Sequence, residues 1–146
     1  MTKYWIDAKN WYDSLEKTHD SYGLAHIDLH TGNFHINNNQ NLTVFDFDDS
    51  AYCFYTYDII VALISLSSKQ TDLFHDEKIK ELYLKGYLTE NSLNKIWIDR
   101  IPAFIRLRNI EMYAWIQFMY GENKKPGHIE YLKSIENSMS QDFQYL

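Results

Sequence analysis

The sequence predicts a mainly helical α+β domain with a small β-hairpin in its first third. Over most of the chain, apolar residues recur at steps of three and four, which is the spacing of an amphipathic helix. Between residues 34 and 44 they alternate with polar residues instead, as in a half-buried strand. The chain has 146 residues, 45% of them hydrophobic, so we expect one domain, 1–146, around a single core.

The first predicted elements are a helix, a short strand and a hairpin. From Tyr4 to about Thr18 the helical spacing is carried by Trp5, Ala8, Trp11, Tyr12 and Leu15. Short apolar runs then predict strands at residues 24–28, 34–36 and 42–44. The polar stretch 37–41 reads NNNQN and tolerates turn conformations, so we expect it to join the last two strands as a hairpin.

The rest of the chain is predicted to be helical. The expected helices cover residues 57–68, 76–87, 92–100, 102–120 and 128–143. The first of them is nearly all apolar, which indicates a buried central helix. Gly86 is expected to end the second helix, and Pro102 is expected to end the third and to occupy the first position of the fourth.

Composition excludes several classes of function. Asp and Glu number 20 against 14 Lys and Arg, and the net charge of −6 has the wrong sign for a nucleic-acid partner. No apolar run is long enough to span a membrane, and the first residues lack the order of a signal peptide. Cys53 is the single cysteine and cannot form an internal disulfide. We therefore expect a cytoplasmic protein without a membrane partner.

Polar residues gather where two of the predicted strands end. The first group is HIDLHTGN at His26–Asn33, and the second is DFDD at Asp46–Asp49. Asp46 follows an apolar run, so we expect a carboxylate at the end of a buried strand, where a charge is costly unless it is paired or metal-bound. Asp28 has a similar position, and Asn33 adds an amide oxygen, so the group suits Mg²⁺. Taken singly, each of these residues is also an ordinary turn former.

The spacing His-x-Asp-x-x-x-x-Asn, followed by a strand-borne Asp-Phe, resembles the catalytic and metal-binding loops of the protein-kinase-like superfamily. HIDLHTGNF, FDFDD and the later YD are similar to the aminoglycoside phosphotransferase and choline kinase branch, nearest its stress-response kinases and type II homoserine kinases. LKGY and PAFIRLRNIEMYAW resemble the same branch. The resemblance covers nearly the whole chain and implies the C-terminal lobe of a protein-kinase-like fold, in which the hairpin carries the catalytic and metal loops. It implies transfer of the γ-phosphate of ATP, with Mg²⁺, to a hydroxyl of a small molecule.

The resemblance also implies roles for matching positions. Asp28 matches the catalytic aspartate that accepts or orients the proton of the acceptor hydroxyl. Asn33 and Asp46 match the ligands of the Mg²⁺ that binds the nucleotide phosphates. His26 is a further candidate catalytic residue. The resemblance implies that it braces the catalytic loop, and a buried histidine satisfied by backbone groups has the same structural role. His30 could contact phosphate or substrate, or be a solvated loop histidine.

Three further aspartates, Asp48, Asp49 and Asp58, are candidates for roles in or near the site. Asp48 is a candidate metal ligand, whereas Asp49 is equally well explained as part of a solvated turn. Asp58 resembles the aspartate that anchors the catalytic loop from the following helix. Its plainer interpretation is a negative charge at a helix N-terminus.

A kinase of this branch also has an N-terminal lobe with a phosphate-covering loop and a nucleotide-binding lysine. The five glycines of this chain form no Gly-rich loop, so we expect a C-terminal lobe alone, as a truncation, a fragment or half of a split enzyme. The surface that the N-terminal lobe would cover predicts self-association or a partner chain.

Two other functions stay open. His26-x-Asp28-x-His30 could form a two-histidine, one-carboxylate transition-metal site, with His75 as a further ligand. The chain could also be a catalytically idle pseudo-kinase or a binding module.

The acceptor is open as well. The net charge of −6 favours a cationic acceptor such as an aminoglycoside, choline or another amino alcohol, and homoserine, serine or threonine hydroxyls are also compatible. Tyr113, Trp115 and Tyr120 could line the acceptor pocket, and core packing is the alternative role for aromatic residues at helical spacing.

Overall fold

The computed structural model describes residues 2–67 and 77–139. It confirms the predicted fold class, since helices dominate and the strands form two small antiparallel sheets. The chain divides into two compact units, Met1–Glu16 with Asp99–Leu146 and Lys17–Ile98, and each is described by itself. A single domain over residues 1–146 stays a prediction.

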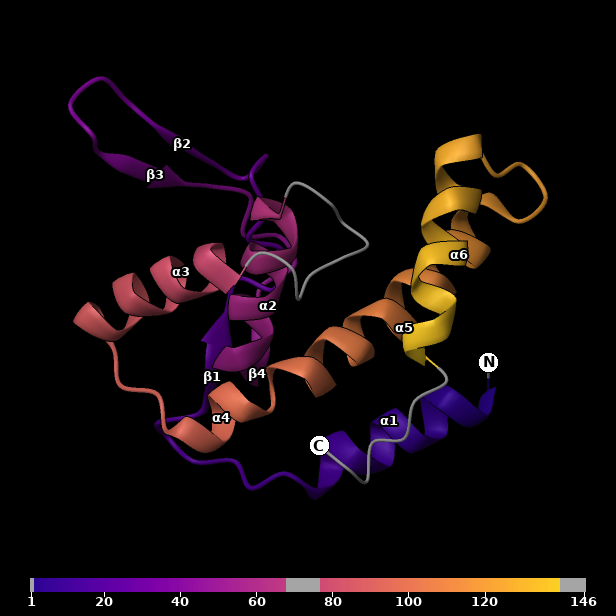
Figure 1. Cartoon of the computed structure of the whole chain (residues 1–146), viewed down its shortest axis with the longest axis horizontal. Helices are drawn as coiled ribbons and strands as arrows, with labels where there is room; N and C mark the ends of the chain where they lie inside the picture. The colour runs from indigo at the N-terminus through magenta and orange to yellow at the C-terminus, as the bar shows by residue number, and fades with distance from the viewer. Residues whose placement is uncertain (1, 68–76, 140–146) are drawn as a thin grey trace. The chain divides into compact units, whose positions relative to one another are not determined.

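The core of the second unit is a two-stranded sheet covered by a helix (Figure 1). Strand β1 (Tyr22–Ala25) pairs antiparallel with β4 (Ala51–Phe54), so that Tyr22 lies opposite Phe54. Helix α2 (Tyr55–Leu66) follows β4 directly and contacts both strands. Phe54 is fully buried and stacks on Trp97 with 4.9 Å between ring centroids. Strand β4 was not predicted. Its pairing with β1 brings Ala51 opposite Ala25, the residue directly before the polar group His26–Asn33.

The predicted hairpin is present. Strand β2 (Phe34–Ile36) pairs with β3 (Leu42–Val44), and Phe34 lies opposite Val44 (Figure 1). The expectation of a buried strand before Asp46 is wrong, because Leu42 and Thr43 are exposed and Val44 is only half-buried. Among the described residues, no further strand pairs with this hairpin.

Two helices complete the second unit. Helix α3 is Glu77–Glu90 and packs on α2, whose residues Ile59 and Ile60 are fully buried. Gly86 does not end α3, which continues for four more residues. Helix α4 (Lys95–Asp99) is short and ends before Pro102, as predicted.

The first unit is made of three helices, α1 (Thr2–Ser14), α5 (Ile101–Tyr120) and α6 (Pro126–Met139). Trp11 of α1 meets the fully buried Phe104 of α5 edge to face, with 5.1 Å between ring centroids. Helices α5 and α6 pack through Ile116, Leu132 and Ile135, and Tyr113, Tyr120 and Tyr131 border that cluster. Pro102 lies in the first turn of α5, as predicted. Residues 140–143, predicted to continue the last helix, lie outside the described residues.

Among the residues that the structure describes, no helix has both the length and the apolar composition that crossing a membrane requires.

Candidate active site

Asp58, in the first turn of α2, accepts hydrogen bonds from the segment between β1 and β2. The backbone N–H of His26 donates to Oδ2 of Asp58 at 2.9 Å, and the N–H of Ile27 donates to Oδ1 at 2.6 Å. Both carboxylate oxygens therefore accept from neighbouring backbone groups more than thirty residues earlier in the chain. A carboxylate in this position is also favourable at the positive end of the helix dipole. Residues 26–33 are called the polar loop below.

The backbone at Ile27 is strained. Its φ is 68°, in the left-handed region that a β-branched residue rarely adopts. Such a conformation costs on the order of 1–3 kcal/mol and persists only where surrounding contacts impose it. The two hydrogen bonds to Asp58 are such contacts, since they fix the amide groups on either side of His26, and the second of these amides forms the peptide that precedes the Cα of Ile27.

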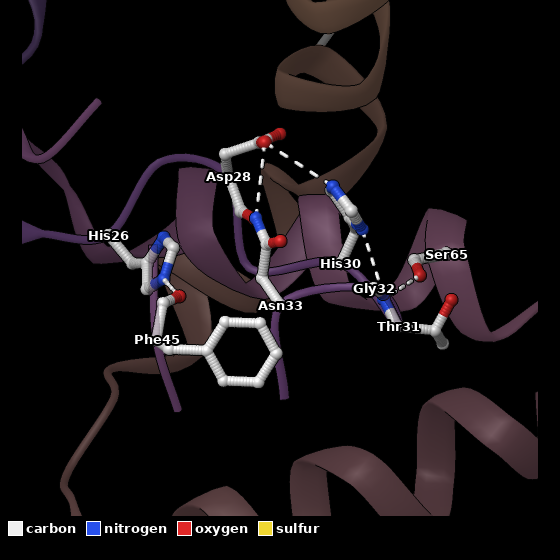
Figure 2. A network of polar contacts seen from close by, with 8 residues as sticks. All are labelled: His26, Asp28, His30, Thr31, Gly32, Asn33, Phe45 and Ser65. Carbon is white, nitrogen blue, oxygen red and sulfur yellow. Dashed lines mark hydrogen bonds and ion pairs between the residues drawn. The ribbon is translucent and has the colours of Figure 1, made fainter. Parts of the chain in front are cut away.

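His26 is buried, and its ring joins the polar loop to the segment after β3. Its Nε2 lies 3.0 Å from the carbonyl oxygen of Phe45, and since a carbonyl only accepts, Nε2–H is the donor (Figure 2). The ring also packs at 4.7 Å from the ring of Phe47. Its Nδ1 is buried and has no hydrogen-bond partner among the residues that the structure describes. The geometry is that of a brace between two loops, and a direct catalytic role stays a prediction.

Asp28 and Asn33 are brought together across the polar loop. The Nδ2 of Asn33 donates to the backbone carbonyl of Asp28 at 2.9 Å and points to Asp28 Oδ2 at 3.4 Å (Figure 2). Because both partners are acceptors, the orientation of the amide is set, and its oxygen faces away from Asp28. Asn33 is buried, and its backbone carbonyl accepts a hydrogen bond from the N–H of Phe45 at 3.0 Å. The two residues therefore form one unit in which Nδ2 of Asn33 is held by Asp28 and the amide oxygen points the other way.

Asp46 lies after β3 with an exposed side chain and a φ of 66°. Within residues 2–67 and 77–139, no donor or cation contacts its carboxylate. Asp48 and Asp49 are also exposed, in a turn closed by a hydrogen bond of 3.0 Å from Ser50 N–H to the Phe47 carbonyl. This turn agrees with the alternative interpretation of Asp49.

The donor set around the polar loop can be tested against Mg²⁺. No group of three or more His, Cys, Asp or Glu side chains in the described ranges could hold a metal ion. Magnesium in nucleotide sites does not need such a group, because one or two protein ligands suffice when phosphates and water supply the rest. The oriented amide oxygen of Asn33 and the unpaired carboxylate of Asp46 are ligands of this kind, so the residues fit the ion.

The transition-metal hypothesis is wrong for the described residues. Residues 26–30 do not alternate as in a strand, because β1 ends at Ala25 and the chain turns at Ile27. His26 is engaged by a carbonyl, and the described residues form no metal-binding cluster of His, Cys, Asp or Glu. His75, named as a further ligand, lies outside the described residues.

Sequence reasoning missed two tyrosines on α3, Tyr83 and Tyr87, that lie close enough to Asp58 to interact with its charge. Burial, the charge of Asp58 and the neighbouring Tyr87, in that order of size, together raise the pKa of Tyr83 to about 12. Burial is also the main cause that raises the pKa of Tyr87, followed by Tyr55 and Asp58. Their spacing of four residues on a predicted helix is the only signal in the sequence that they share a face.

Tyr113, Trp115 and Tyr120, the predicted lining of the acceptor pocket, belong to the first unit. Tyr113 and Tyr120 are partly buried against the cluster of α5 and α6, in agreement with the alternative of core packing, and Trp115 is half-exposed. Their contact with an acceptor stays a prediction.

Comparison with known proteins identifies relatives with the same organisation. Amicoumacin kinase of Bacillus subtilis (strain 168) is 35% identical over 133 residues, which cover 84% of this chain and 39% of the relative. An amicoumacin kinase solved in complex with AMP-PNP, Ca²⁺ and Ami superposes with a TM-score of 0.76 at 26% identity, covering 94% of this chain and 44% of that one. The microcompartment-associated aminopropanol kinase superposes with a TM-score of 0.72 at 22% identity, covering 94% and 43%, and shows the fold alone.

The chain thus spans less than half the length of these relatives. A family model described as the phosphotransferase enzyme family matches residues 3–90, a segment that contains every candidate residue from His26 to Asp58. The match covers more than half of the 146 residues. The resemblance seen in the sequence is therefore confirmed, and the chain belongs to the phosphotransferase enzyme family.

Proposed function

We propose that this protein is an ATP-dependent phosphotransferase that moves the γ-phosphate of ATP to a hydroxyl of a small molecule. The observation that carries the proposal is the polar loop itself. Its Asp28 and Asn33 are joined by hydrogen bonds, and the loop is anchored through both carboxylate oxygens of Asp58. Membership of the phosphotransferase family and the similarity to amicoumacin kinases support the same reaction.

Asp28 is the proposed catalytic residue. Its side chain is about one-third exposed, so an acceptor hydroxyl can reach it. It would accept the proton of that hydroxyl, or orient it, as the hydroxyl oxygen bonds to the γ-phosphorus, the bond from that phosphorus to the β–γ bridging oxygen breaks and ADP leaves. Phosphoryl transfer depends on positioning and charge neutralisation more than on covalent chemistry, which explains why a fixed loop matters.

Asn33 and Asp46 are the proposed ligands of Mg²⁺, and Asp48 is a further candidate from the turn that follows. When bound, the ion would neutralise the phosphate charge that develops during transfer. Asn33 would offer its amide oxygen while its Nδ2 stays on the carbonyl of Asp28. Asp46 would offer a carboxylate that the described part of the protein leaves unpaired. The solved amicoumacin kinase that contains AMP-PNP and Ca²⁺ supports a nucleotide with a divalent ion.

The proposed acceptor is a cationic amino alcohol. The net charge of −6 favours positive charge in an incoming molecule. We expect no nucleic-acid partner for the same reason. A cytoplasmic location is part of the proposal, supported by the presence of a single cysteine, Cys53, which cannot form an internal disulfide.

Self-association, or a partner chain, is also proposed. Large apolar side chains are exposed in both units, among them Ile36 at 63% and Phe118 at 86%. Such side chains favour association when they are contiguous on a surface. Sedimentation velocity over a hundredfold range of concentration tests this proposal, and a monomer throughout would contradict self-association.

Transfer from γ-labelled ATP to a panel of amino alcohols and uncharged alcohols tests the reaction. We expect labelled product with Mg²⁺, more from the amino alcohols, and a loss of about 10²–10⁴-fold in turnover in Asp28→Asn. Asp49→Asn is the matched control, since it removes an exposed aspartate of the same group. Equal turnover in both variants would contradict the role of Asp28. Absence of transfer by the unaltered chain, with partner binding retained in Asp28→Asn, would favour the pseudo-kinase or binding module.

A further inference from the structure

His30 contacts the polar loop through both nitrogens of its ring. Its Nδ1 accepts from the backbone N–H of Gly32 at 2.9 Å, and its Nε2 lies 3.4 Å from Oδ2 of Asp28 (Figure 2). The ring therefore bridges the backbone of the loop and the carboxylate proposed as catalytic.

These contacts determine which nitrogen carries the proton. The N–H of Gly32 can only donate, so Nδ1 must present its lone pair. A neutral imidazole then carries its proton on Nε2, and that nitrogen faces the Asp28 carboxylate. The backbone contact of one nitrogen thus aims a donor at Asp28 through the other.

Gly32 makes this arrangement possible. A Cβ at position 32 would lie 2.6 Å from Cε1 and 2.9 Å from Nδ1 of the His30 ring, closer than real contacts allow. The backbone φ of Gly32 is not in the left-handed region that favours glycine. A side chain at position 32 would therefore have to displace the His30 ring, whereas the backbone conformation itself would accept one.

Two hydrogen bonds fix the part of the loop backbone that orients the His30 ring. The N–H of Asn33 donates to the His30 carbonyl at 2.9 Å, which closes a turn around Gly32. The N–H of Thr31 donates to Oγ of Ser65 on α2 at 2.6 Å. A continuous series of contacts thus runs from α2 through the loop backbone and the His30 ring to Asp28 (Figure 2).

We propose that His30 is a positioning residue that holds the Asp28 carboxylate in place for proton acceptance, and that Gly32 is its required neighbour. The inference rests on the proposed function, because it assigns a role towards the catalytic aspartate. It differs from the role that the family resemblance implied for His30, a contact to phosphate or substrate. Such a contact through Nε2 would require the ring to leave Asp28.

Two substitutions separate the two contacts of the ring. His30→Gln places an amide N–H donor near the position of Nε2 and removes the acceptor near Nδ1. His30→Asn places an amide oxygen near the position of Nδ1 and removes the donor to Asp28. His30→Ala removes both, and His19→Ala is the control, since the side chain of His19 is fully exposed in the same unit.

The first measurement is made by NMR on the chain without nucleotide, so it is independent of activity. Imidazole ¹⁵N shifts should show His30 protonated at Nε2 in the unaltered protein, and Gly32→Ala should abolish this single-tautomer signature. The ¹³C signal of the Asp28 carboxyl should stay near its original position in His30→Gln and shift in His30→Asn and His30→Ala. Protonation at Nδ1, or an Asp28 signal that is the same in all four histidine variants, would overturn the proposal.

The second measurement separates positioning from phosphate contact. We expect His30→Asn and His30→Ala to lower kcat roughly 10- to 100-fold with KM for ATP nearly unchanged, and His30→Gln to recover most of kcat. A raised KM for ATP with kcat retained would overturn the proposal in favour of phosphate contact. If the unaltered chain shows no transfer at all, the proposed function fails, while the NMR result still decides whether His30 holds Asp28.

Discussion

Replacing Asp58 by asparagine tests whether the anchor from α2 holds the polar loop. The substitution keeps the size of the side chain, but one of its two acceptors becomes an NH₂ group facing a backbone N–H. In the structure these acceptors receive bonds of 2.9 Å from His26 and 2.6 Å from Ile27, so one bond must be lost.

The magnitude follows from the contacts. An N–H left without its partner costs about 1–3 kcal/mol, and loss of the charge at the N-terminus of α2 costs about 0.3–1 kcal/mol more. We therefore expect Asp58→Asn to lower the free energy of unfolding by about 1–4 kcal/mol. The strained backbone of Ile27 should relax at the same time, since the bonds that impose its φ of 68° are weakened.

Chemical denaturation followed by circular dichroism measures the stability, and amide hydrogen exchange at His26 and Ile27 reports the anchor locally. Asp49→Asn is the control, because its side chain is exposed and lies in a turn. The reasoning would be refuted if both variants lost the same stability, within about 0.5 kcal/mol, and exchange at the two amides stayed unchanged.

Three further predictions concern packing and pH. Gly23→Ala should destabilise the protein by about 1–3 kcal/mol in a denaturant titration, because its Cβ would lie 2.1 Å from the hydroxyl of Tyr55. Gly86→Ala should instead stabilise it by about 0.5–1 kcal/mol, because that position is inside α3 and has nothing within 4 Å; a loss of stability would contradict this. The folded state binds the Tyr83 proton more tightly, with a pKa of about 12 against 10.0, so its stabilising effect is complete below pH 10 and is lost between pH 10 and 12. The free energy of unfolding should fall by up to about 2–3 kcal/mol over that range, and a fall of the same size in Tyr83→Phe would contradict the assignment.

The fold could be predicted where the signal is local. The hairpin was predicted because alternation and a polar turn lie within eleven consecutive residues, and α5 because Pro102 marks its start. Strand β4 was missed because four residues without clear alternation pass directly into a helix, and only pairing with β1 defines them. The prediction that Gly86 ends its helix was wrong, because a glycine ends a helix only where the backbone turns into a capping conformation. Inside a helix a glycine costs about 1 kcal/mol relative to alanine, and α3 continues past Gly86 despite this cost.

The sequence supplied the candidate residues of the site and the anchoring role of Asp58, but not most of the contacts among them. The spacing from His26 to Asn33 and the position of Asp46 were sufficient to identify the loops. The burial expected before Asp46 was wrong, because burial depends on what covers the hairpin rather than on its own apolar residues. The contact of His30 with Gly32 could not be foreseen, because a glycine required for space looks the same in sequence as one required for a turn.

The central claim is that the polar loop and Asp46 form a site for a metal-bound nucleotide. Calorimetric titration of the 146-residue chain with ATP, with and without Mg²⁺, tests it directly, using Asp46→Ala as the test variant and Asp49→Ala as the control. We predict binding that requires Mg²⁺, persists in Asp49→Ala and is lost in Asp46→Ala. Binding that ignores Mg²⁺ or survives in Asp46→Ala, or no binding at millimolar ATP, would contradict the account.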